Sequence, residues 1–250
     1  MTTIAFAALP NEEAIAYFKE KGFANAFDRF SWKDVWGEEH ARSFTVAKAV
    51  RDDVLTEIRD ALLSAIEDGT TLETFKAAME PKLRELGWWG KGIVEDPKTG
   101  EIAEAQLGSA RRLRVIYDTN LRTANSAGRW ARVQRNKRLM PFLTYIQIDR
   151  PSARDAHKPW HGITLPVDHE FWKTHYAPNG WFCGCMIRQV SARTVEKESL
   201  TLTTEEELAP FRETRPYFND RLGITEQVPV GIDPGFAHNP GLARFDPSEK

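Results

Sequence analysis

Residues 149–185 constrain the fold of this chain more than any other stretch, because they hold both cysteines and four of the six histidines. The same stretch contains prolines at positions 151, 159, 166 and 178, and proline interrupts helices and central strands. We therefore expect a long loop without repeating backbone hydrogen bonds. The β-branched and aromatic runs Phe142–Ile148 and Met186–Val190 are typical of strands. They bracket the loop, so its two ends could meet in space.

The histidines and cysteines of this loop indicate a metal site. Two histidines in H-x3-H spacing and two cysteines in C-x-C spacing form an ordinary tetrahedral zinc set; the candidate ligands are His157, His161, Cys183 and Cys185. A structural zinc ion would stabilise a loop that has no large core of its own. Against it, C-x-C is tighter than the usual knuckle, Pro159 lies between the two histidines, and His169 or His175 could replace either. The alternative is a pair of small buried thiols beside tryptophans, with hydrogen-bonded histidines.

A catalytic use of the same residues is the second alternative. Asp149 and Asp155, together with the two histidines, could hold a hydrolytic metal, with Arg150 or Arg154 on a phosphate. The protein would then be a nuclease. The spacing of these acids and histidines matches no nuclease signature, and cysteine ligands favour a closed structural site. We therefore expect a protein that is not an enzyme.

Outside the loop, apolar residues recur with helical spacing. Apolar positions every four residues from Val46 to Ile66 predict one or two long helices in residues 31–68, which Gly69 would end. Further helices are predicted for residues 12–21, 70–86 and 109–137. Small residues along one side of the last helix indicate a close approach by another helix.

The other side of residues 109–138 is strongly basic and is the candidate nucleic-acid-binding surface. Its members are Arg111, Arg112, Arg114, Arg122, Arg129, Arg132, Arg135, Lys137 and Arg138. Such a stripe could follow the phosphates of DNA. The alternative is a solvated face that pairs with the acidic helices earlier in the chain.

Length and composition limit the remaining possibilities. A chain of 250 residues can bury a real core, and its net charge of −2 excludes a wholly basic nucleic-acid binder. No apolar run approaches the ~20 residues that a membrane span needs, no secretion signal is evident, and two cysteines this close suit a reducing compartment.

We predict an α+β fold, mainly helical, with a small β-sheet bracketing the long loop as a zinc-stabilised hairpin. The expected parts are an N-terminal arm and short helix (1–30), a helical domain (31–140), a β/loop domain with the histidine and cysteine cluster (141–200) and an extended C-terminal tail (201–250).

A series of short motifs runs through most of the chain. These are residues 13–18, 39–48, 87–90, 117–120 and 128–129, then Asp149-Arg150-Pro151 with His157 and Gly162, then 178–181 leading into Cys183 and Cys185, and finally 231–236 with 239–241. In order and spacing they resemble the phage Mu F-like minor head proteins, also called the phage head morphogenesis family.

The resemblance implies a virion component present in few copies, which acts in head assembly close to the portal and stays inside the head with the DNA. The implied partners are the portal protein, the major capsid or scaffold protein, and double-stranded DNA, with no membrane; the implied location is the virion, and the host cytoplasm during assembly. A packaged DNA-binding protein is a further alternative.

The sequence departs from the family pattern at two positions. The family usually has arginine between the cysteines, where this chain has Gly184. The position of His161 varies in the family, so the resemblance favours His157, Cys183 and Cys185 as ligands. Relatives often carry an extra C-terminal domain, which we do not expect here.

Overall fold

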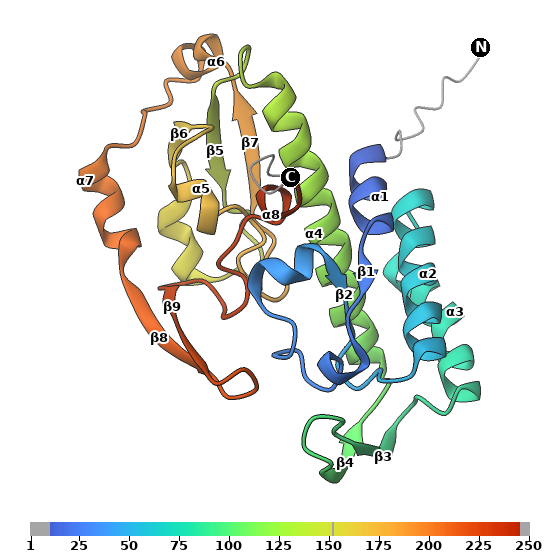
Figure 1. Cartoon of the computed structure of the whole chain (residues 1–250). Coiled ribbons are helices and arrows are strands. Elements are labelled where there is room, and N and C mark those ends of the chain that lie inside the picture. The colour runs from blue at the N-terminus through green and yellow to red at the C-terminus, as the bar shows by residue number, and fades with distance from the viewer. Residues whose placement is uncertain (1–10, 152, 246–250) are drawn as a thin grey trace, which may run out of the picture.

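The computed structural model of this chain describes residues 11–151 and 153–245 (Figure 1). The molecule has two parts, one made of helices and one built around a small sheet. The two parts meet along the long helix α4, Ala110–Asn136. Helices and short strands occur together, which confirms the predicted α+β class. The arm predicted for residues 1–10 lies outside the described residues.

The helical half contains three helices besides α4: α1 (Glu12–Lys19), α2 (Asp52–Asp68) and α3 (Leu72–Glu85). Their apolar faces pack against α4 in a first core, which includes the fully buried Phe18, Leu55 and Leu62. Helix α2 ends at Gly69, whose φ of 67° is the left-handed conformation that glycine adopts most easily. Among the described residues, no helix combines the length and the hydropathy that crossing a membrane requires.

Residues 31–51 contain no α-helix, so the prediction of long helices from residue 31 is wrong before Asp52. Residues 22–51 instead contain short elements. Strand β1 (Gly22–Phe23) pairs in parallel with β2 (Ser43–Phe44), and η1 (Ala26–Asp28) and η2 (Gly37–Ala41) are short 3-10 helices. Tertiary contacts explain the difference. The buried Arg29 side chain donates to the carbonyls of Ala24 and Val50, and Trp36 stacks on Tyr217 with ring centroids 5.5 Å apart.

Helix α4 contributes side chains to both cores. Ala124 and Ala127 lie in the first core, and Trp130 and Val133 lie in the second. A Cβ atom built at Gly128 would lie 2.7 Å from the backbone nitrogen of Ala14. The small residues of α4 therefore allow α1 to approach closely, as predicted.

The second core lies around a three-stranded antiparallel sheet with the order β6-β5-β7. The strands are β5 (Phe142–Ile146), β6 (Thr164–Pro166) and β7 (Met186–Val190), and the 3-10 turn η3 (Asp155–Trp160) and the short helix α5 (Phe171–Thr174) lie between them in the chain. Pairing of β5 with β7 brings the two ends of the long loop together, as predicted. A separate hairpin of β3 (Lys91–Glu95) and β4 (Ile102–Gln106) precedes α4.

The C-terminal part of the chain is folded rather than an extended tail. Its elements are α6 (Ala192–Lys197), α7 (Glu205–Leu208), η4 (Ala209–Arg212), the hairpin of β8 (Thr214–Asn219) and β9 (Ile224–Pro229), and α8 (Pro240–Phe245). Val228 and Ile232 are buried in the second core, and a Cβ atom at Gly241 would collide with Trp130 of α4. Burial of these apolar residues explains why the segment packs on the body despite its many prolines and glycines.

Candidate metal centre

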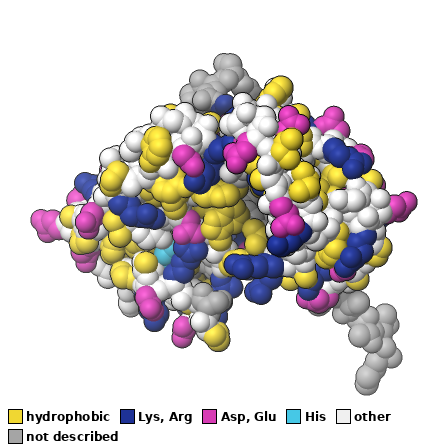
Figure 2. Space-filling view, turned by 90° about the horizontal axis from the view of Figure 1, so that it is seen from below, with side chains coloured by type: hydrophobic (Ala, Val, Ile, Leu, Met, Phe, Trp, Pro, Cys, Tyr) yellow, Lys and Arg dark blue, Asp and Glu magenta, His cyan; other side chains and the backbone are white. Residues whose placement is uncertain are grey.

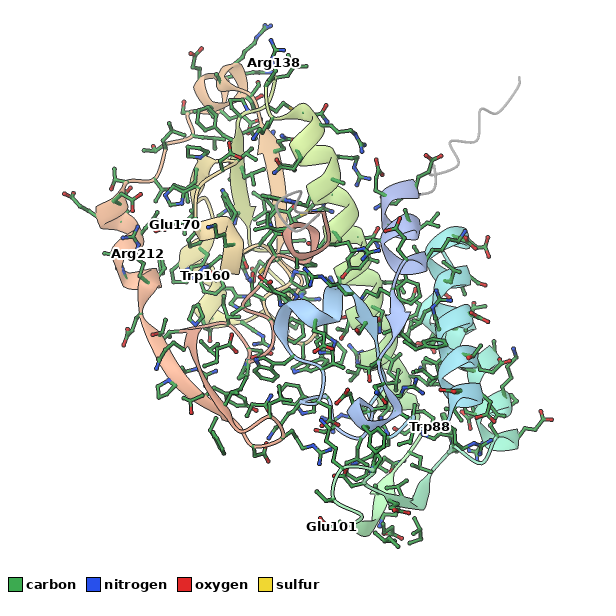
Figure 3. All side chains as sticks on the ribbon, in the orientation of Figure 1. Trp88, Glu101, Arg138, Trp160, Glu170 and Arg212 are labelled. Atoms are coloured by element: carbon green, nitrogen blue, oxygen red, sulfur yellow. The ribbon has the colours of Figure 1, made fainter. Side chains whose placement is uncertain are left out.

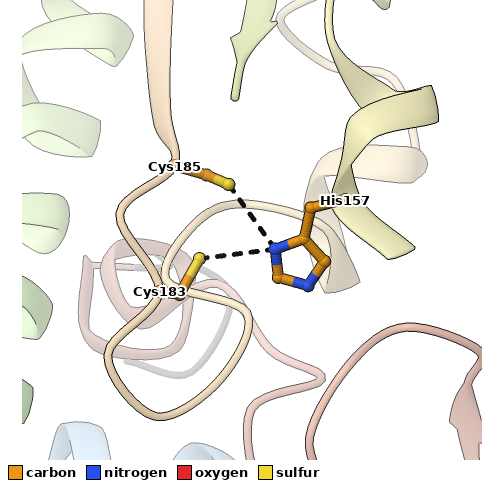
Figure 4. Close-up of side chains that lie close together, drawn as sticks. All are labelled: His157, Cys183 and Cys185. Atoms are coloured by element: carbon orange, nitrogen blue, oxygen red, sulfur yellow. Dashed lines mark hydrogen bonds between the residues drawn. The ribbon is translucent and has the colours of Figure 1, made fainter. Parts of the chain in front are cut away.

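Three of the four predicted ligands lie together at the open end of the β5–β7 pair (Figure 4). The Nδ1 atom of His157 is 3.7 Å from Sγ of Cys183 and 3.5 Å from Sγ of Cys185. Zn–S bonds of about 2.3 Å and Zn–N bonds of about 2.1 Å in a tetrahedron separate nitrogen and sulfur ligands by about 3.6 Å. Both nitrogen–sulfur distances therefore fit one zinc ion held by two thiolates and one imidazole.

A contact with the C-terminal segment orients the imidazole of His157. Its Nε2 lies 2.9 Å from the carbonyl oxygen of Gly231, which can only accept a hydrogen bond. We therefore assign the ring proton to Nε2, so that Nδ1 presents its lone pair to the two sulfur atoms. Trp160 stacks on the ring with centroids 4.5 Å apart. A hydrogen bond from the second ring nitrogen, such as that to Gly231, is the support that metal-binding histidines commonly have.

The two thiols influence each other. The hydrogen bond with Cys185 lowers the pKa of Cys183, and the hydrogen bond with His157 acts in the same direction. The interaction with Cys183 and burial raise the pKa of Cys185. Two thiolates this close repel each other, so a bound cation would allow both to ionise.

A second interaction holds the loop that carries the cysteines. Arg154 donates to both carboxylate oxygens of Asp233 at 2.6 Å and to the carbonyl of Trp181 at 2.9 Å. The carboxylate of Asp233 also accepts the backbone N–H of Trp181 at 2.9 Å. Burial raises the pKa of Asp233, but the hydrogen bonds from Arg154 and Trp181 outweigh it and lower the pKa overall. The carboxylate is therefore ionised and ties residue 233 to both ends of the loop.

The other predicted histidines lie outside the cluster. His161 is exposed, and its Nδ1 accepts the backbone N–H of Gln147. His169 pairs with Glu205, and His175 bonds to the hydroxyl of Thr174. H-x3-H spacing would place two histidines on one face of a helix, whereas residues 155–160 form a 3-10 turn that contains Pro159. The structure thus supports a set of three ligands without His161.

The nuclease alternative requires aspartate side chains beside the histidine. Among the described residues, the cluster of His157, Cys183 and Cys185 includes no carboxylate. Asp155 is exposed and forms an ion pair with Lys158 at 2.8 Å. The guanidinium of Arg150 donates to the carbonyl of Phe182 and lies against Gly184. Its side chain therefore fills the space where a residue other than glycine would place its Cβ atom.

Most of the predicted nucleic-acid-binding residues have partners within the fold. Arg112 donates to backbone carbonyls that include that of Leu107, and burial lowers its pKa to about 10. Four others pair with carboxylates and one bonds to a backbone carbonyl: Arg122 with Asp118, Arg132 and Arg135 with Glu13, Lys137 with Asp168, and Arg129 with the carbonyl of Ile187.

The remaining three basic residues of the predicted surface are Arg111, Arg114 and Arg138, and all three are exposed. Arg114 lies over the ring of Phe182, 5.1 Å from its centroid. Arg138, just beyond the end of α4, lies at the edge of the molecule (Figure 3). On the face seen in Figure 2, basic and acidic side chains are interspersed.

Sequence reasoning missed the residues that support the centre from a distance. These are Gly231 and Asp233, which lie more than 45 positions after Cys185, and the buried pair in which Tyr145 donates to Asn179 at 2.9 Å. Residues 231–236 stood out only as one of the motifs that resemble the family, and nothing in the sequence indicated what this segment contacts.

The family of Phage Mu protein F like proteins matches residues 56–188, which include α4, most of the sheet and all three clustered ligands. This chain belongs to that family. The resemblance to Mu F-like proteins is thereby confirmed.

Two curated relatives extend the similarity beyond the matched region. The chain is 38% identical over 253 residues to "Putative capsid assembly protein F" of Escherichia phage Mu, covering 97% of this chain and 57% of that protein. It is 33% identical over 226 residues to "Mu-like prophage FluMu F protein" of Haemophilus influenzae, covering 86% of this chain and 53% of that protein. The chain therefore spans about half the length of these two Mu F relatives. No solved structure matches the chain.

Proposed function

We propose that this protein acts in phage head morphogenesis as a minor structural component of the head. The observation that carries the proposal is the 38% identity to a protein named as a capsid assembly protein, over 97% of this chain. Because the chain spans about half of that relative, the role of the whole relative enters here as a proposal.

The candidate metal centre supports a structural role. A zinc ion on His157, Cys183 and Cys185 would join the loop before β7 to η3, and through Gly231 to the C-terminal segment. Thiolate ligands are typical of zinc sites that stabilise a fold. We propose that such an ion stiffens the loop that connects β6 to β7 and its contact with η3.

Within this role we propose a position close to the portal and contact with packaged DNA. Arg111, Arg114 and Arg138 support the DNA contact, because all three are exposed and no described carboxylate forms an ion pair with them. Few phosphate contacts give weak binding whose dependence on salt is shallow. That behaviour suits a protein that meets DNA at high concentration inside a head.

Quantitative mass spectrometry of purified particles and of the infected-cell lysate tests the proposal. We expect the protein in particles at a small, fixed ratio to the portal protein, with the major capsid protein as the abundance reference. A protein that is abundant in the lysate, absent from particles and dispensable for forming filled heads would overturn the proposed function.

A further inference from the structure

The hairpin of β3 and β4 has free strand edges. In the sheets of the described residues the two strands pair only with each other, and the hairpin projects from the lower end of the molecule (Figure 1). Its inner face is fixed, because Val94 packs against the first core and a Cβ atom at Gly92 would lie 2.6 Å from the side chain of Leu107. A strand edge held in this way is preorganised to pair with another strand.

The hydrogen bonds of the hairpin show which backbone groups of β3 face outward. At one end the N–H of Leu107 donates to the carbonyl of Gly90. At the other end the N–H of Asp96 donates to the carbonyl of Glu101. Bonded pairs alternate along an antiparallel ladder, so the even-numbered residues of β3 bond to β4 and the odd-numbered residues point their N–H and C=O groups away from it. The outward-pointing residues are Lys91, Ile93 and Glu95.

The side chains of these three residues share one exposed face of the strand. Ile93 is 72% exposed, and the side chain of Lys91 is 70% exposed. Lys91 forms an ion pair with Glu104 of β4 at 2.9 Å, whereas Glu95 forms none with a described residue. The edge therefore carries a cation at one end, an apolar side chain in the middle and an unpaired carboxylate at the other end.

This order of side chains is complementary to itself. If two copies of β3 pair antiparallel with Ile93 opposite Ile93 on a two-fold axis, Lys91 of each copy lies opposite Glu95 of the other. Opposite charges that face each other across a ladder stabilise it, and like charges destabilise it. A parallel pair in register would place lysine opposite lysine, and an antiparallel pair shifted by two residues would lose both ion pairs. One register is therefore favoured over the others.

The free edge of β4 has the opposite property. By the same alternation its outward-pointing residues are Ile102, Glu104 and Gln106. Antiparallel pairing of two β4 edges would place Glu104 opposite Glu104, with no ion pair at either end to compensate. The charges therefore favour β3 over β4 as the pairing edge.

We propose that two copies of this chain associate through β3 and form a four-stranded antiparallel sheet with the order β4-β3-β3-β4. Each copy contributes the outward N–H and C=O groups of Lys91, Ile93 and Glu95, and the two ion pairs set the register. A contact of five residues a side buries less than the roughly 1,200 Å² of a stable interface, so the dimer is weak and forms at high local concentration. The proposal goes beyond the role in head assembly and rests on this hairpin alone.

Sedimentation of the full chain over a range of concentrations tests the proposal. We expect a reversible equilibrium between monomer and dimer. Lys91→Glu and Glu95→Lys should each weaken the dimer at least tenfold, because two-fold symmetry turns two ion pairs into two like-charge contacts. A mixture of the two variants should dimerise again, because the acidic edge of one then faces the basic edge of the other.

Glu101→Lys is the matched control for these variants. Glu101 is exposed and lies at the tip of the same hairpin, outside β3 (Figure 3). The substitution changes the net charge as much as Glu95→Lys does, and it should leave the dimer as strong as that of the wild type. Thermal melting checks that each variant is folded, and recovery of the dimer in the mixture requires both of its members to be folded.

Cysteine cross-linking tests the register. Directly opposite residues of a bonded pair have Cα atoms about 5.5 Å apart, which lies within the range for a disulfide. Ile93→Cys should therefore yield a covalent dimer under mild oxidation, above the background of the wild type. Ile102→Cys is the control, because Ile102 is 66% exposed but lies on an outer strand of the proposed sheet, at least three strand spacings, or roughly 14 Å, from its counterpart.

The proposal fails if the full chain stays monomeric at millimolar concentration, if Glu101→Lys weakens the dimer as much as Glu95→Lys, or if the mixture of the two variants stays monomeric. Cross-linking through Ile102→Cys in place of Ile93→Cys would assign the contact to β4. A chain that is monomeric alone but binds an extended peptide through this edge would assign β3 to another protein and would equally overturn the proposal. No particles enter these measurements, so their outcome and that of the particle analysis are independent.

Discussion

His157 joins three parts of the chain that are far apart in the sequence. Its Nδ1 faces Cys183 and Cys185, and its Nε2 bonds to the carbonyl of Gly231. A change at this residue therefore affects both the candidate ligand set and the attachment of the C-terminal segment. The neighbouring His161 has neither contact, so it provides a matched control.

We expect one zinc ion per chain in the wild type and in His161→Ala, and none in His157→Ala or Cys183→Ser. A metal present at about 100 times its dissociation constant stabilises by about 3 kcal/mol, so a chelator should lower the melting temperature by about 6–10 °C. Metal analysis and thermal melting with and without the chelator measure both effects. Equal metal content in His157→Ala and the wild type would reject the centre. A chelator that abolished DNA cleavage without affecting melting would favour the nuclease alternative.

Two glycines of the cysteine loop differ in what surrounds them. A Cβ atom at Gly180 would lie 2.5 Å from the carboxylate of Asp233, which Arg154 and Trp181 hold in place. The three atoms nearest to a Cβ atom at Gly184 all belong to the guanidinium of Arg150, at the far end of a long side chain. We expect Gly180→Ala to cost about 1–3 kcal/mol and Gly184→Ala less than about 1 kcal/mol. Urea unfolding of the two variants measures the difference, and equal costs would contradict the packing seen at Asp233.

At the scale of elements, local periodicity predicted the helices whose apolar residues recur at helical spacing over several turns and are buried in a core. Helix α2 from Asp52 and the long helix α4 follow this rule. The rule failed for residues 31–51, where the carbonyl of Val50 accepts a hydrogen bond from Arg29 and Trp36 stacks on Tyr217. Such contacts depend on residues as distant as Tyr217, which a local pattern does not include.

In the candidate metal centre, too, local sequence patterns predicted one part of the arrangement and contacts between distant segments determined the other. The H-x3-H and C-x-C spacings and the two flanking strands predicted a cluster of four ligands, and the resemblance to the Mu F-like family favoured His157, Cys183 and Cys185 among them. The exclusion of His161 depends on the 3-10 turn around Pro159, and the support from Gly231 and Asp233 depends on a segment that returns from the C-terminal part of the chain. The sequence identified ligand types, whereas the fold selected among them.

The contact between α1 and α4 gives a prediction at this scale. Gly128→Ala would raise the helix propensity of α4 by about 1 kcal/mol, but its Cβ atom would press on the backbone of Ala14. Since backbone cannot move aside cheaply, we expect a net destabilisation of about 1–3 kcal/mol. Gly22→Ala is the control, because nothing lies within 4 Å of its Cβ position. Thermal melting compares the stability of Gly128→Ala with that of Gly22→Ala. A Gly128→Ala variant more stable than the wild type would mean that α1 and α4 leave room for a methyl group.

At the scale of the whole molecule, one arginine connects three distant segments. Arg221, in the turn of the β8–β9 hairpin, donates to Asp34 at 2.7 Å and to both carboxylate oxygens of Asp96 in the turn of the β3–β4 hairpin. The side chain of Asp34 is fully buried and that of Asp96 nearly so. Removing one partner of a buried ion pair leaves an uncompensated charge. These contacts thus fasten both hairpins to the segment before α2.

We expect Arg221→Met to destabilise the protein by about 3–5 kcal/mol at pH 7, measured by urea unfolding. The hydrogen bond from Arg221 lowers the pKa of Asp96 from its ordinary value of 3.8. The stability that Asp96 contributes is therefore present above about pH 4 and is lost as the pH falls below that value. The variant should lose less stability than the wild type on acidification, and adding Asp34→Asn and Asp96→Asn should recover part of the loss at pH 7. A variant as stable as the wild type at pH 7 would contradict this role.

Lys21 destabilises the fold at neutral pH, whereas Arg221 stabilises it, because Lys21 is a buried cation without a described acidic partner. It is 7% exposed, and its ammonium lies 4.8 Å from the centre of the Tyr17 ring. Burial, followed by the charge of Arg244, lowers the pKa of Lys21 to about 7. Between pH 7 and 10 the unfolded chain therefore carries a proton on this lysine that the folded chain releases.

This difference fixes the sign of the pH dependence, because stability rises with pH wherever the unfolded state binds more protons. The contribution of Lys21 to stability should rise by up to about 1.4 kcal/mol per pH unit above pH 7. Lys21→Met should be more stable than the wild type at pH 7 by about 1–4 kcal/mol, since an apolar side chain replaces a poorly solvated charge. The variant should also have a flatter profile between pH 7 and 9. Lys19→Met is the control, because Lys19 is exposed and pairs with Glu67. Urea unfolding across this pH range measures both slopes, and parallel profiles for Lys21→Met and the wild type would show that the folded chain keeps Lys21 charged.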